Sequence, residues 1–412
     1  MKASRIPEPP TDSERPRVVY VTASLPFGRG EHFVVPEIDG LAGQGIEVVV
    51  CPRRWQSSAV DPDRRHLVAQ AIEPRLLSIP IVVQALRSLL RSPARVIRAV
   101  WRLRESRSSG VLAKNLAVVP KALWLAEYAR THHIRHFHAH WASTTATLTM
   151  LASEVSGVPF SFTAHRWDIA EDNLLTAKVR AATFVRAIDQ LGAEEIAMLS
   201  GVRDSEIVII HMGVAASPAT PVRDLKQPPT IVIPAMLIEI KGHKYLLEAI
   251  ARLVERGRHV RLEIIGDGPE RAAIERDIVT RRLEEHVTIR GFVPHDQLLR
   301  ELEEGRFDIA VLPSVGTAAD SREGIPVALM ETLAAGVPSV ATSMGGIPEL
   351  LHDGAGVLVP ERDPEAIAEA VERLMSDSAY RSSIVECGSA RVRSDFAIDL
   401  ICIELAQRFL AT

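Results

Sequence analysis

The chain has 412 residues, of which 47% are hydrophobic and 24% charged, and its formal net charge is -4. This length exceeds one ordinary hydrophobic core, so two domains are expected, and the slightly negative charge argues against a nucleic-acid partner. The three cysteines are far apart and follow neither a disulfide nor a zinc-site spacing. No apolar run reaches the roughly 20 residues that span a bilayer, and we expect a cytoplasmic protein.

The amino-terminal half alternates short apolar runs with amphipathic stretches. Residues 1–16 are polar and proline-rich and are expected to be a disordered tail. The apolar runs are rich in β-branched and aromatic residues, which predicts buried strands at 17–22, 47–52, 137–141 and 160–165. Helical patterns separate the strands, and one of them ends at Gly157.

A second series of strands follows residues 218–229. That segment contains four prolines and no apolar period, so it is predicted to be a linker. Strands are predicted beyond it at 230–236, 261–268, 286–293, 307–314, 338–343 and 356–360. Because strands alternate with helices, we expect parallel sheets with right-handed crossovers. The sequence therefore predicts an α/β protein with two Rossmann-like domains, residues 17–217 and 230–389, and a ligand cleft at the strand ends.

The stretch from Glu323 to Glu331 says most about function. Two carboxylates lie eight residues apart, and between them come Gly324, Ile325, Pro326 and an apolar run that starts at Val327. If Pro326 occupies the first turn of a helix, its missing N–H costs nothing there. The free N–H groups of such a helix start point towards a bound ligand. One carboxylate is then placed for the reacting end of that ligand and the other for hydroxyl groups further along it.

This arrangement resembles the paired-Glu motif of family 4 retaining glycosyltransferases. Further segments resemble the branch that builds bacterial exopolysaccharides of the colanic-acid type, in the same order: 28–38, 160–169, 238–250, 264–270 and 321–350. The resemblance implies the GT-B architecture, in which two Rossmann-like domains face each other across a cleft and a carboxyl-terminal helix, from about residue 390, crosses back to the first. It also implies retaining, metal-independent and cofactor-independent sugar transfer from a nucleotide-sugar, most commonly a UDP-sugar, to a hydroxyl acceptor.

The resemblance assigns roles to individual side chains. Glu323 faces the donor sugar, and Glu331 hydrogen-bonds the ribose of the nucleotide; the alternative is a pair of solvated carboxylates at a helix end. His165, at the end of the strand predicted at 160–165, lies beside the donor sugar and the acceptor. For His165 the alternative is a histidine that is hydrogen-bonded in the core.

Lys241 is the predicted diphosphate contact and is expected at the start of a helix. Gly242, the next residue, allows the chain to turn sharply into that helix. A lysine at a helix N-terminus opposes the helix dipole unless an anion is bound there; the alternative is an exposed surface lysine. Many members of the family carry an arginine five residues earlier, where this chain has Met236. One cation of the diphosphate site is then missing, and Arg29 is a candidate to replace it.

Glycines and strand ends supply the remaining predicted donor contacts. Gly28 and Gly30 follow the first strand, where glycine lets the backbone approach a diphosphate or a sugar closely. Gly266 resembles a turn at the donor site, and the nucleobase-reading segment is matched by Gly291, Phe292 and Val293. Ordinary turns at strand ends are the alternative for all of them.

His136, His138 and His140 alternate along one predicted strand and share a face. Three imidazoles on one face suggest zinc. No fourth ligand is apparent, and the glycosyltransferase class needs no metal for its chemistry. We therefore predict no metal site and interpret these histidines as hydrogen-bonded or cleft-lining.

Residues 81–107 carry seven arginines and one glutamate. A basic amphipathic helix of this kind in the acceptor domain is a candidate contact with the anionic inner face of the plasma membrane. The alternative is a solvated helix face that covers the core. Pro93 is expected to break the stretch into two helices.

The acceptor and the reaction class leave several hypotheses open. A lipid-linked saccharide fits the exopolysaccharide-like motifs and the arginine-rich stretch, and a soluble secondary metabolite is the alternative acceptor. From other classes, a nucleotide-sugar epimerase uses the same two-domain architecture. A non-catalytic partner subunit is favoured only by the missing cation at Met236.

Overall fold

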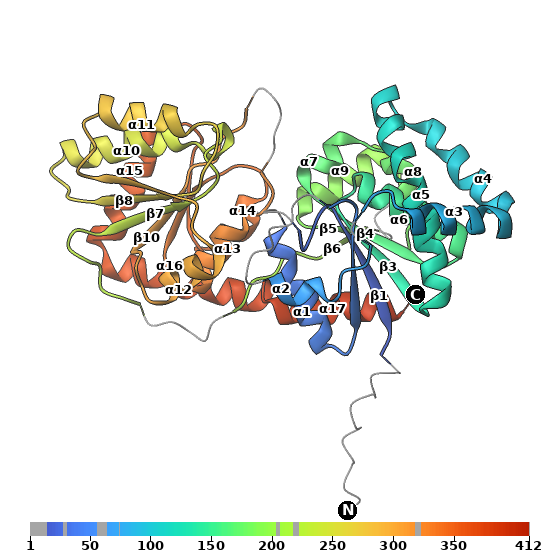
Figure 1. The fold of residues 1–412 in the computed structure, drawn as a ribbon. Coiled ribbons are helices and arrows are strands. Elements are labelled where there is room, and N and C mark those ends of the chain that lie inside the picture. The colour runs from blue at the N-terminus through green and yellow to red at the C-terminus, as the bar shows by residue number, and fades with distance from the viewer. Residues whose placement is uncertain are drawn as a thin grey trace, which may run out of the picture. The chain divides into compact units, whose positions relative to one another are not determined.

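The computed structural model describes residues 15–27, 31–55, 64–73, 75–202, 207–216, 222–317 and 323–411. The chain divides into two compact units (Figure 1). Unit 1 comprises Met1–Ile188, Gly192–Ile210 and Asp399–Thr412, and unit 2 comprises Asp189–Leu191 and His211–Ile398. Each unit contains its own parallel sheet with connecting helices, so the predicted α/β class with two Rossmann-like units is confirmed.

The sheet of unit 1 has six parallel strands in the order β2-β1-β3-β4-β5-β6. Their bounds are β1 Arg17–Thr22, β2 Glu47–Pro52, β3 Ile134–His140, β4 Phe160–Ala164, β5 Phe184–Ala187 and β6 Ile207–Ile209. Most of the strand residues are buried, as expected for a parallel sheet covered on both faces. Strands β5 and β6 have no counterpart among the predicted strands, because runs of four and three residues are too short to give a clear period.

The helices of unit 1 include several that the sequence predicted, among them α3, α4 and α6. Their bounds are η1 His32–Val34, α1 Val35–Gly43, α2 Arg65–Val68, α3 Ile79–Arg91, α4 Pro93–Arg102, η3 Leu103–Glu105, α5 Ser109–Thr131, α6 Thr144–Ser156, α7 Arg166–Glu171, α8 Leu175–Ala181, α9 Gln190–Ser200 and α17 Ile398–Leu410. Gly157 ends α6 in the left-handed region at φ +85°, which glycine adopts without strain. Pro93 begins α4 directly after α3, so the predicted break is confirmed.

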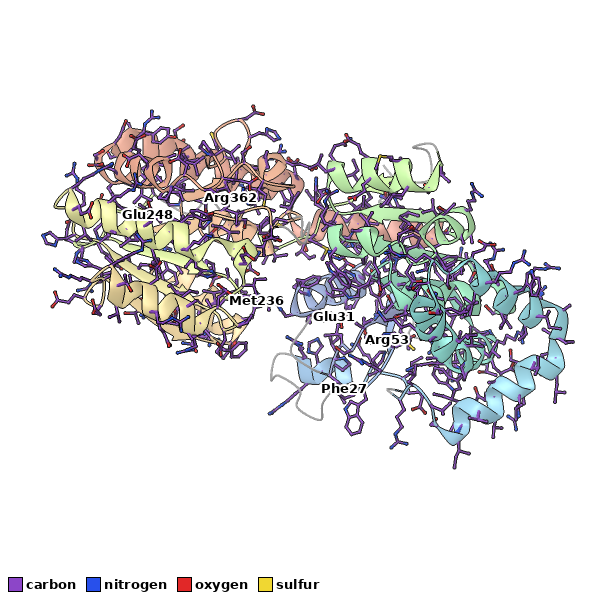
Figure 2. All side chains as sticks on the ribbon, turned by 90° about the horizontal axis from the view of Figure 1, so that it is seen from above. Phe27, Glu31, Arg53, Met236, Glu248 and Arg362 are labelled. Carbon is purple, nitrogen blue, oxygen red and sulfur yellow. The ribbon has the colours of Figure 1, made fainter. Side chains whose placement is uncertain are left out.

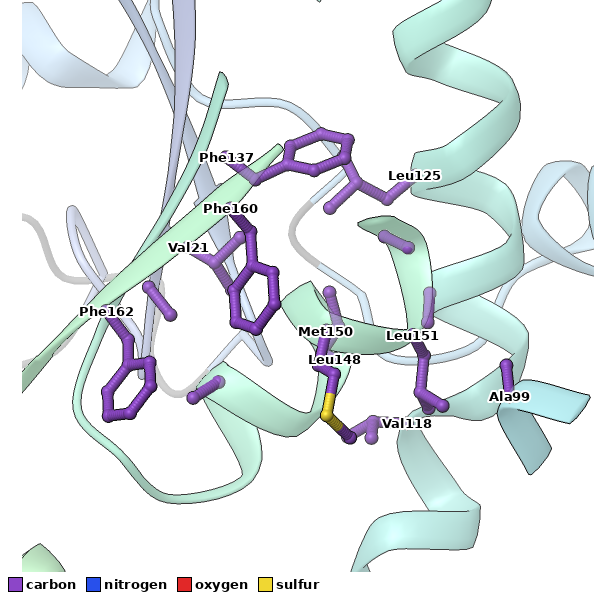
Figure 3. Close-up of a cluster of buried hydrophobic side chains, with 14 of the residues drawn as sticks. Val21, Ala99, Val118, Leu125, Phe137, Leu148, Met150, Leu151, Phe160 and Phe162 are labelled. Carbon is purple, nitrogen blue, oxygen red and sulfur yellow. The ribbon is translucent and has the colours of Figure 1, made fainter. Parts of the chain in front are cut away.

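The main core of unit 1 lies between its sheet and the helices α4, α5 and α6 (Figure 3). Strands β3 and β4 contribute Phe137, Phe160 and Phe162, and α6 contributes Leu148 and Leu151. All five side chains are at most 1% exposed. Truncating one of these phenylalanines to alanine is expected to cost about 3–5 kcal/mol, because it removes apolar burial and leaves a cavity.

The chain returns to unit 1 through α17 (Figure 1). The Phe409 ring lies 5.1 Å from the His136 ring and 6.1 Å from the Tyr20 ring. The preceding helix α16, Ser378–Asp395, belongs to unit 2, where the Ser389 hydroxyl donates to the Leu333 carbonyl. The returning helix therefore begins at Ile398 rather than near residue 390.

The sheet of unit 2 has six parallel strands in the order β12-β11-β10-β7-β8-β9. Counted along the chain, this is the order 3-2-1-4-5-6 read from the opposite edge, the strand order of dinucleotide-binding domains. The bounds are β7 Thr230–Pro234, β8 Arg261–Ile265, β9 Val287–Gly291, β10 Ile309–Leu312, β11 Ser339–Thr342 and β12 Val357–Val359. All six predicted strands exist, but each is shorter than predicted because the flanking residues of each predicted run form turns.

The helices of unit 2 have the bounds η5 Glu239–Lys241, α10 His243–Glu255, α11 Arg271–Thr280, α12 His295–Glu303, α13 Val327–Ala334, α14 Ile347–Leu351, α15 Pro364–Ser376 and α16 Ser378–Asp395. Of the predicted linker, residues 222–229 are described, and they pack on unit 2. There the Arg223 guanidinium donates to the Leu302 carbonyl at 3.2 Å. Among the described helices of both units, none is long and apolar enough to cross a bilayer.

Candidate functional site

The strand order of unit 2 reverses between β7 and β10, which are hydrogen-bonded neighbours. In open α/β sheets, ligands bind beyond the carboxyl ends of the strands at such a switch point. Lys241 lies on the loop that follows β7, and Glu323 lies on the loop that follows β10. The topology therefore brings two of the predicted catalytic residues together, although 82 residues separate them in the chain.

The Lys241 ammonium and the Glu323 carboxylate form an ion pair. The Lys241 Nζ to Glu323 Oε2 distance is 2.6 Å, and the Ser314 hydroxyl donates to the same oxygen at 3.1 Å. Both charged side chains are about 15% exposed, and Ser314 is fully buried. Charge-assisted hydrogen bonds between groups with so little exposure to solvent are strong. Ser314 was not among the predicted site residues, because a serine at a strand end carries no distinctive sequence signal.

Gly242 is required by the geometry around Lys241. Its φ is +65°, and a Cβ added there would lie 1.9 Å from the Pro313 carbonyl oxygen. Glycine therefore lets the loop after β7 touch the loop after β10. The prediction that Lys241 opens a helix was wrong in detail. Lys241 ends the short helix η5, and α10 begins two residues later, at His243, because the left-handed Gly242 separates the two.

Glu323 and Glu331 flank the start of α13, as predicted. Pro326 is the residue preceding the helix, with extended backbone angles of φ -70° and ψ 121°, rather than a residue of its first turn. Its lack of an N–H is harmless in either position, because the first N–H groups of a helix have no intrahelical partner. Gly324 lies in the loop, and Ile325 is buried. Val327 is the first residue of α13.

Glu331 is 8% exposed and lies in the second turn of α13. His295, the first residue of α12, reaches its carboxylate with an Nε2 to Oε1 distance of 2.6 Å. His295 is not among the site residues predicted from the sequence. A lone histidine after a proline carries no signal until the fold shows what it faces.

The other predicted donor contacts lie at the carboxyl ends of β7, β8 and β9. Gly266 has φ +145°, and a Cβ there would lie 2.0 Å from the Ala235 carbonyl oxygen, so only glycine fits. Met236 lies on the surface with 61% of its side chain exposed (Figure 2). Gly291 has φ +73° and ends β9.

Beyond β9, Phe292 is 59% exposed and Val293 is half-buried. Gly291 pairs with Ile265, and the Gly266 N–H donates to the Gly291 carbonyl at 2.9 Å, so the segment begins beside the turn that follows β8. Gly28, Arg29 and Gly30 lie outside the described residues.

Unit 1 has a comparable constellation around Glu31, which the sequence analysis did not single out. Its carboxylate accepts the backbone N–H groups of Ala23, Ser24 and Leu25 at 2.8–2.9 Å and the Trp141 indole N–H at 2.7 Å. These donors follow β1 and β3, the neighbours between which the strand order of unit 1 changes direction. Trp141 has φ +89°, a strained value for a bulky residue. Strain of this kind persists where surrounding contacts fix it.

His165 directly follows β4, and its Nε2 lies 2.9 Å from the Nε2 of His140. Its backbone N–H donates to Asp168 at 2.7 Å. Burial and the nearby Arg186 lower the pKa of His165 to about 3, so the imidazole is neutral at neutral pH. A neutral imidazole can donate one hydrogen bond and accept another, but it supplies no positive charge.

The three alternating histidines are buried and hydrogen-bonded. His136 and His138 both contact the Ser161 hydroxyl at 2.8 Å. Ligand atoms of Glu37, His138 and His140 lie within 4.8 Å of one another, close enough to hold a metal ion. The Glu37 carboxylate is, however, already bound by the Arg186 guanidinium at 2.5 Å and the Tyr20 hydroxyl at 3.0 Å. These contacts favour the interpretation as core histidines.

The arginine-rich stretch forms α3 and α4 and exposes two kinds of side chain. The exposed apolar side chains recur at helical spacing: Ile79, Val82, Val83, Leu86, Leu89 and Leu90 on α3, and Ile97 and Trp101 on α4. Different residues, among them Ile81, Ala85, Val96 and Ala99, face the core. Arg91 pairs with Glu127 and Arg102 with Glu154. The exposed face is therefore apolar with arginines beside it, rather than a uniformly solvated face.

Residues 228–377 match the family model described as "Glycosyl transferases group 1". The matched segment contains the Lys241, Ser314 and Glu323 cluster and most of unit 2. Unit 2 therefore contains a group 1 glycosyl transferase domain, and the resemblance carried by the paired glutamates is confirmed there.

Two relatives of this chain are named for colanic acid and amylovoran biosynthesis. It is 37% identical over 206 residues to the putative colanic acid biosynthesis glycosyltransferase WcaL of Escherichia coli K12, covering 49% of this chain and 50% of WcaL. It is 38% identical over 184 residues to the amylovoran biosynthesis glycosyltransferase AmsK of Erwinia amylovora, covering 44% of this chain and 45% of AmsK. The chain thus spans about half the length of the curated relatives it matches.

Solved structures share the fold over almost the whole chain. The crystal structure of Anabaena Alr3699/HepE in complex with UDP superposes with a TM-score of 0.68 at 17% identity, covering 96% of this chain and 100% of that chain. This likeness covers unit 1 as well as unit 2, and at 17% identity it concerns the fold alone.

Proposed function

We propose that this protein is a retaining glycosyltransferase that moves a sugar from a nucleotide-sugar, with a UDP-sugar the first choice, to a hydroxyl acceptor in exopolysaccharide or glycoconjugate biosynthesis. The observation that carries the proposal is the cluster of Lys241, Ser314 and Glu323 at the switch point of a group 1 glycosyl transferase domain. The UDP complex of the structurally similar HepE supports the choice of nucleotide.

The chemistry we assign follows from where charge develops. The bond between the sugar and the diphosphate breaks while the acceptor oxygen bonds to the same face of the sugar. Lys241 and the free N–H groups at the start of α13 stabilise the leaving diphosphate. Glu323 stabilises positive charge on the sugar, and Glu331 holds the ribose. The acceptor proton passes to the departing phosphate oxygen, with the neutral His165 orienting the acceptor hydroxyl. No metal ion or cofactor takes part in this scheme.

For the acceptor we propose a polyprenyl-diphosphate-linked saccharide, and a soluble secondary metabolite is the alternative. The exposed apolar side chains of α3 and α4 favour the first. On binding a membrane, these apolar side chains would be buried in the headgroup region and removed from water. The neighbouring arginines would then contact anionic lipids. We accordingly place the enzyme in the cytoplasm, at the inner face of the plasma membrane.

The first test is a thermal-shift panel of UDP-, GDP-, ADP- and dTDP-sugars on wild type and Glu331→Ala. A ligand that binds only the folded state raises its stability by about 2.7 kcal/mol at a hundredfold excess over Kd. We expect a shift with one nucleotide that is lost in the variant. A product with inverted anomeric configuration, or activity abolished by a chelator, would contradict the retaining, metal-independent scheme.

Two rival functions predict different results in the same panel. A nucleotide-sugar epimerase isomerises the donor without any acceptor, so new donor signals in the NMR spectrum would support it. A non-catalytic partner subunit binds no donor, and the absence of a shift with every nucleotide would favour it.

A further inference from the structure

The carboxylate of Glu331 has two oxygens in different situations. Its Oε1 is 2.6 Å from His295 Nε2. Because an ionised carboxylate only accepts hydrogen bonds, the His295 nitrogen carries the proton in this contact. The second oxygen, Oε2, accepts no hydrogen bond from any described residue. It is also not among the buried side-chain atoms of the described residues that lack a partner, so it keeps contact with solvent.

The position of His295 ties two parts of the donor site together. It is the first residue of α12 and lies two residues after Val293, which ends the segment predicted to read the nucleobase. Glu331 lies on a different helix, α13, which follows β10. The contact between these two side chains therefore links the helix that follows the predicted base-reading segment to the residue assigned to the ribose.

A glutamate without such a contact samples several rotamers, and ordering it on ligand binding opposes affinity. A carboxylate held by one oxygen presents the other in a fixed direction, ready to accept from a sugar hydroxyl. The strength of a hydrogen bond to a charged acceptor depends on that alignment.

We propose that His295 is a positioning residue that holds Glu331 in the orientation required to accept hydrogen bonds from the ribose hydroxyls of the donor nucleotide. The proposal rests on the function proposed above and identifies a determinant of ribonucleotide selectivity. It assigns to His295 an effect that depends on the hydroxyl groups of the ligand, which a merely structural histidine would not show.

The test is a cycle of two ligands and three proteins, measured by calorimetric titration. UDP and 2′,3′-dideoxy-UDP are titrated into wild type, His295→Ala and His295→Gln. We expect wild type to prefer UDP by about tenfold or more, the effect of aligned hydrogen bonds to a charged group. His295→Ala should weaken UDP by a similar factor and leave dideoxy-UDP nearly unchanged. His295→Gln, whose amide can still donate, should recover part of the preference.

His259→Ala is the matched control, because His259 is exposed and precedes β8, at the opposite edge of the sheet from the predicted ligand. Thermal unfolding without ligand checks that each variant folds. Equal weakening of both nucleotides in His295→Ala, or no weakening of either, overturns the positioning role alone. Undetectable binding of every nucleotide to wild type overturns the proposed function and this inference together.

Discussion

The Lys241 ammonium lies 2.6 Å from the Glu323 carboxylate, so the two side chains assigned to the diphosphate and to the donor sugar contact each other. A diphosphate that binds Lys241 competes with Glu323 for the same charge. On the roles proposed for these two residues, we expect binding of the donor to loosen the ion pair and to free Glu323 to face the sugar. The pair keeps both charges compensated while no anion is present, which matters because both are largely shielded from water.

Replacing Lys241 should affect donor binding, whereas replacing Glu323 should affect turnover. Lys241→Ala is expected to weaken UDP binding, because it removes the diphosphate contact and leaves Glu323 as an uncompensated anion. Glu323→Gln is expected to bind UDP at least as tightly as wild type, because the carboxylate that competes for Lys241 is gone. It is expected to lose about 10²–10³-fold in turnover, since it removes charge stabilisation at the reacting sugar. Titration calorimetry and a donor-hydrolysis or transfer assay separate the two effects. Glu323→Gln with wild-type turnover would contradict the assignment.

Replacing Met236 with arginine should restore the missing cation. A hydrogen bond to a charged group contributes about 1.5–3 kcal/mol, so UDP affinity is expected to rise by about tenfold or more in Met236→Arg. Met236 is well exposed, and the new side chain meets no packing conflict in the core. Met236→Gln, which adds polarity without charge, is the control. Equal affinities for all three proteins would show that the diphosphate does not reach this side of the loop.

Gly242 and Gly257 offer a matched comparison of close approach and backbone strain. Both have left-handed φ values, +65° and +72°. A Cβ at Gly242 collides with the Pro313 carbonyl, whereas a Cβ at Gly257 meets no atom within 4 Å. Gly257→Ala should therefore cost only the left-handed penalty of about 1–2 kcal/mol. Gly242→Ala should cost more and also weaken UDP binding, because it displaces Lys241. Equal losses in urea unfolding would refute the role of close approach.

Acid should destabilise unit 1 through its buried histidines. Burial lowers the pKa of His136 to about 3, while an unfolded histidine titrates near 6.5. Between these values the unfolded state binds the extra proton, so the stabilisation is complete above pH 6.5 and is lost as the pH falls. In His136→Gln the slope of unfolding free energy against pH between 6 and 4 should drop by about 1 kcal/mol per unit.

All five tryptophans lie in unit 1, so their fluorescence reports its unfolding. His259→Gln, at an exposed position outside unit 1, is the control. If the unfolding free energies of wild type and His136→Gln change in parallel with pH, the lowered pKa of His136 is contradicted.

The exposed face of α3 and α4 should bind anionic vesicles. Wild type is expected to sediment with phosphatidylglycerol-containing liposomes and to remain in solution with pure phosphatidylcholine. Leu86→Glu combined with Leu90→Glu should abolish sedimentation, because it places charges where apolar contact is needed. Met198→Glu, at an equally exposed apolar position on α9, is the control. If the exposed face of α3 and α4 instead joins two copies of the chain, wild type will be a dimer in solution and will not sediment with the liposomes.

Some structural elements of this protein can be predicted from the sequence because they depend only on residues that are close together in the chain. Strands β1 and β2 were predicted to the residue, since each is a buried run of β-branched residues bounded by breakers. The left-handed ends at Gly157 and Gly242 follow from glycine alone. The same locality explains the errors at Pro326 and Lys241, where the pattern places a helix start correctly to within one or two residues but not closer.

What the sequence by itself determined is therefore the α/β class, the two-unit organisation and the family of the Glu323 to Glu331 motif. Only the tertiary structure decided which side chains meet. The Lys241–Glu323 pair, the His295–Glu331 contact and the Glu31 carboxylate with its donors join residues from different loops and helices. Their distances depend on strand order and on how closely neighbouring loops approach. Periodicity along a chain carries no information about contacts between side chains that are far apart in it.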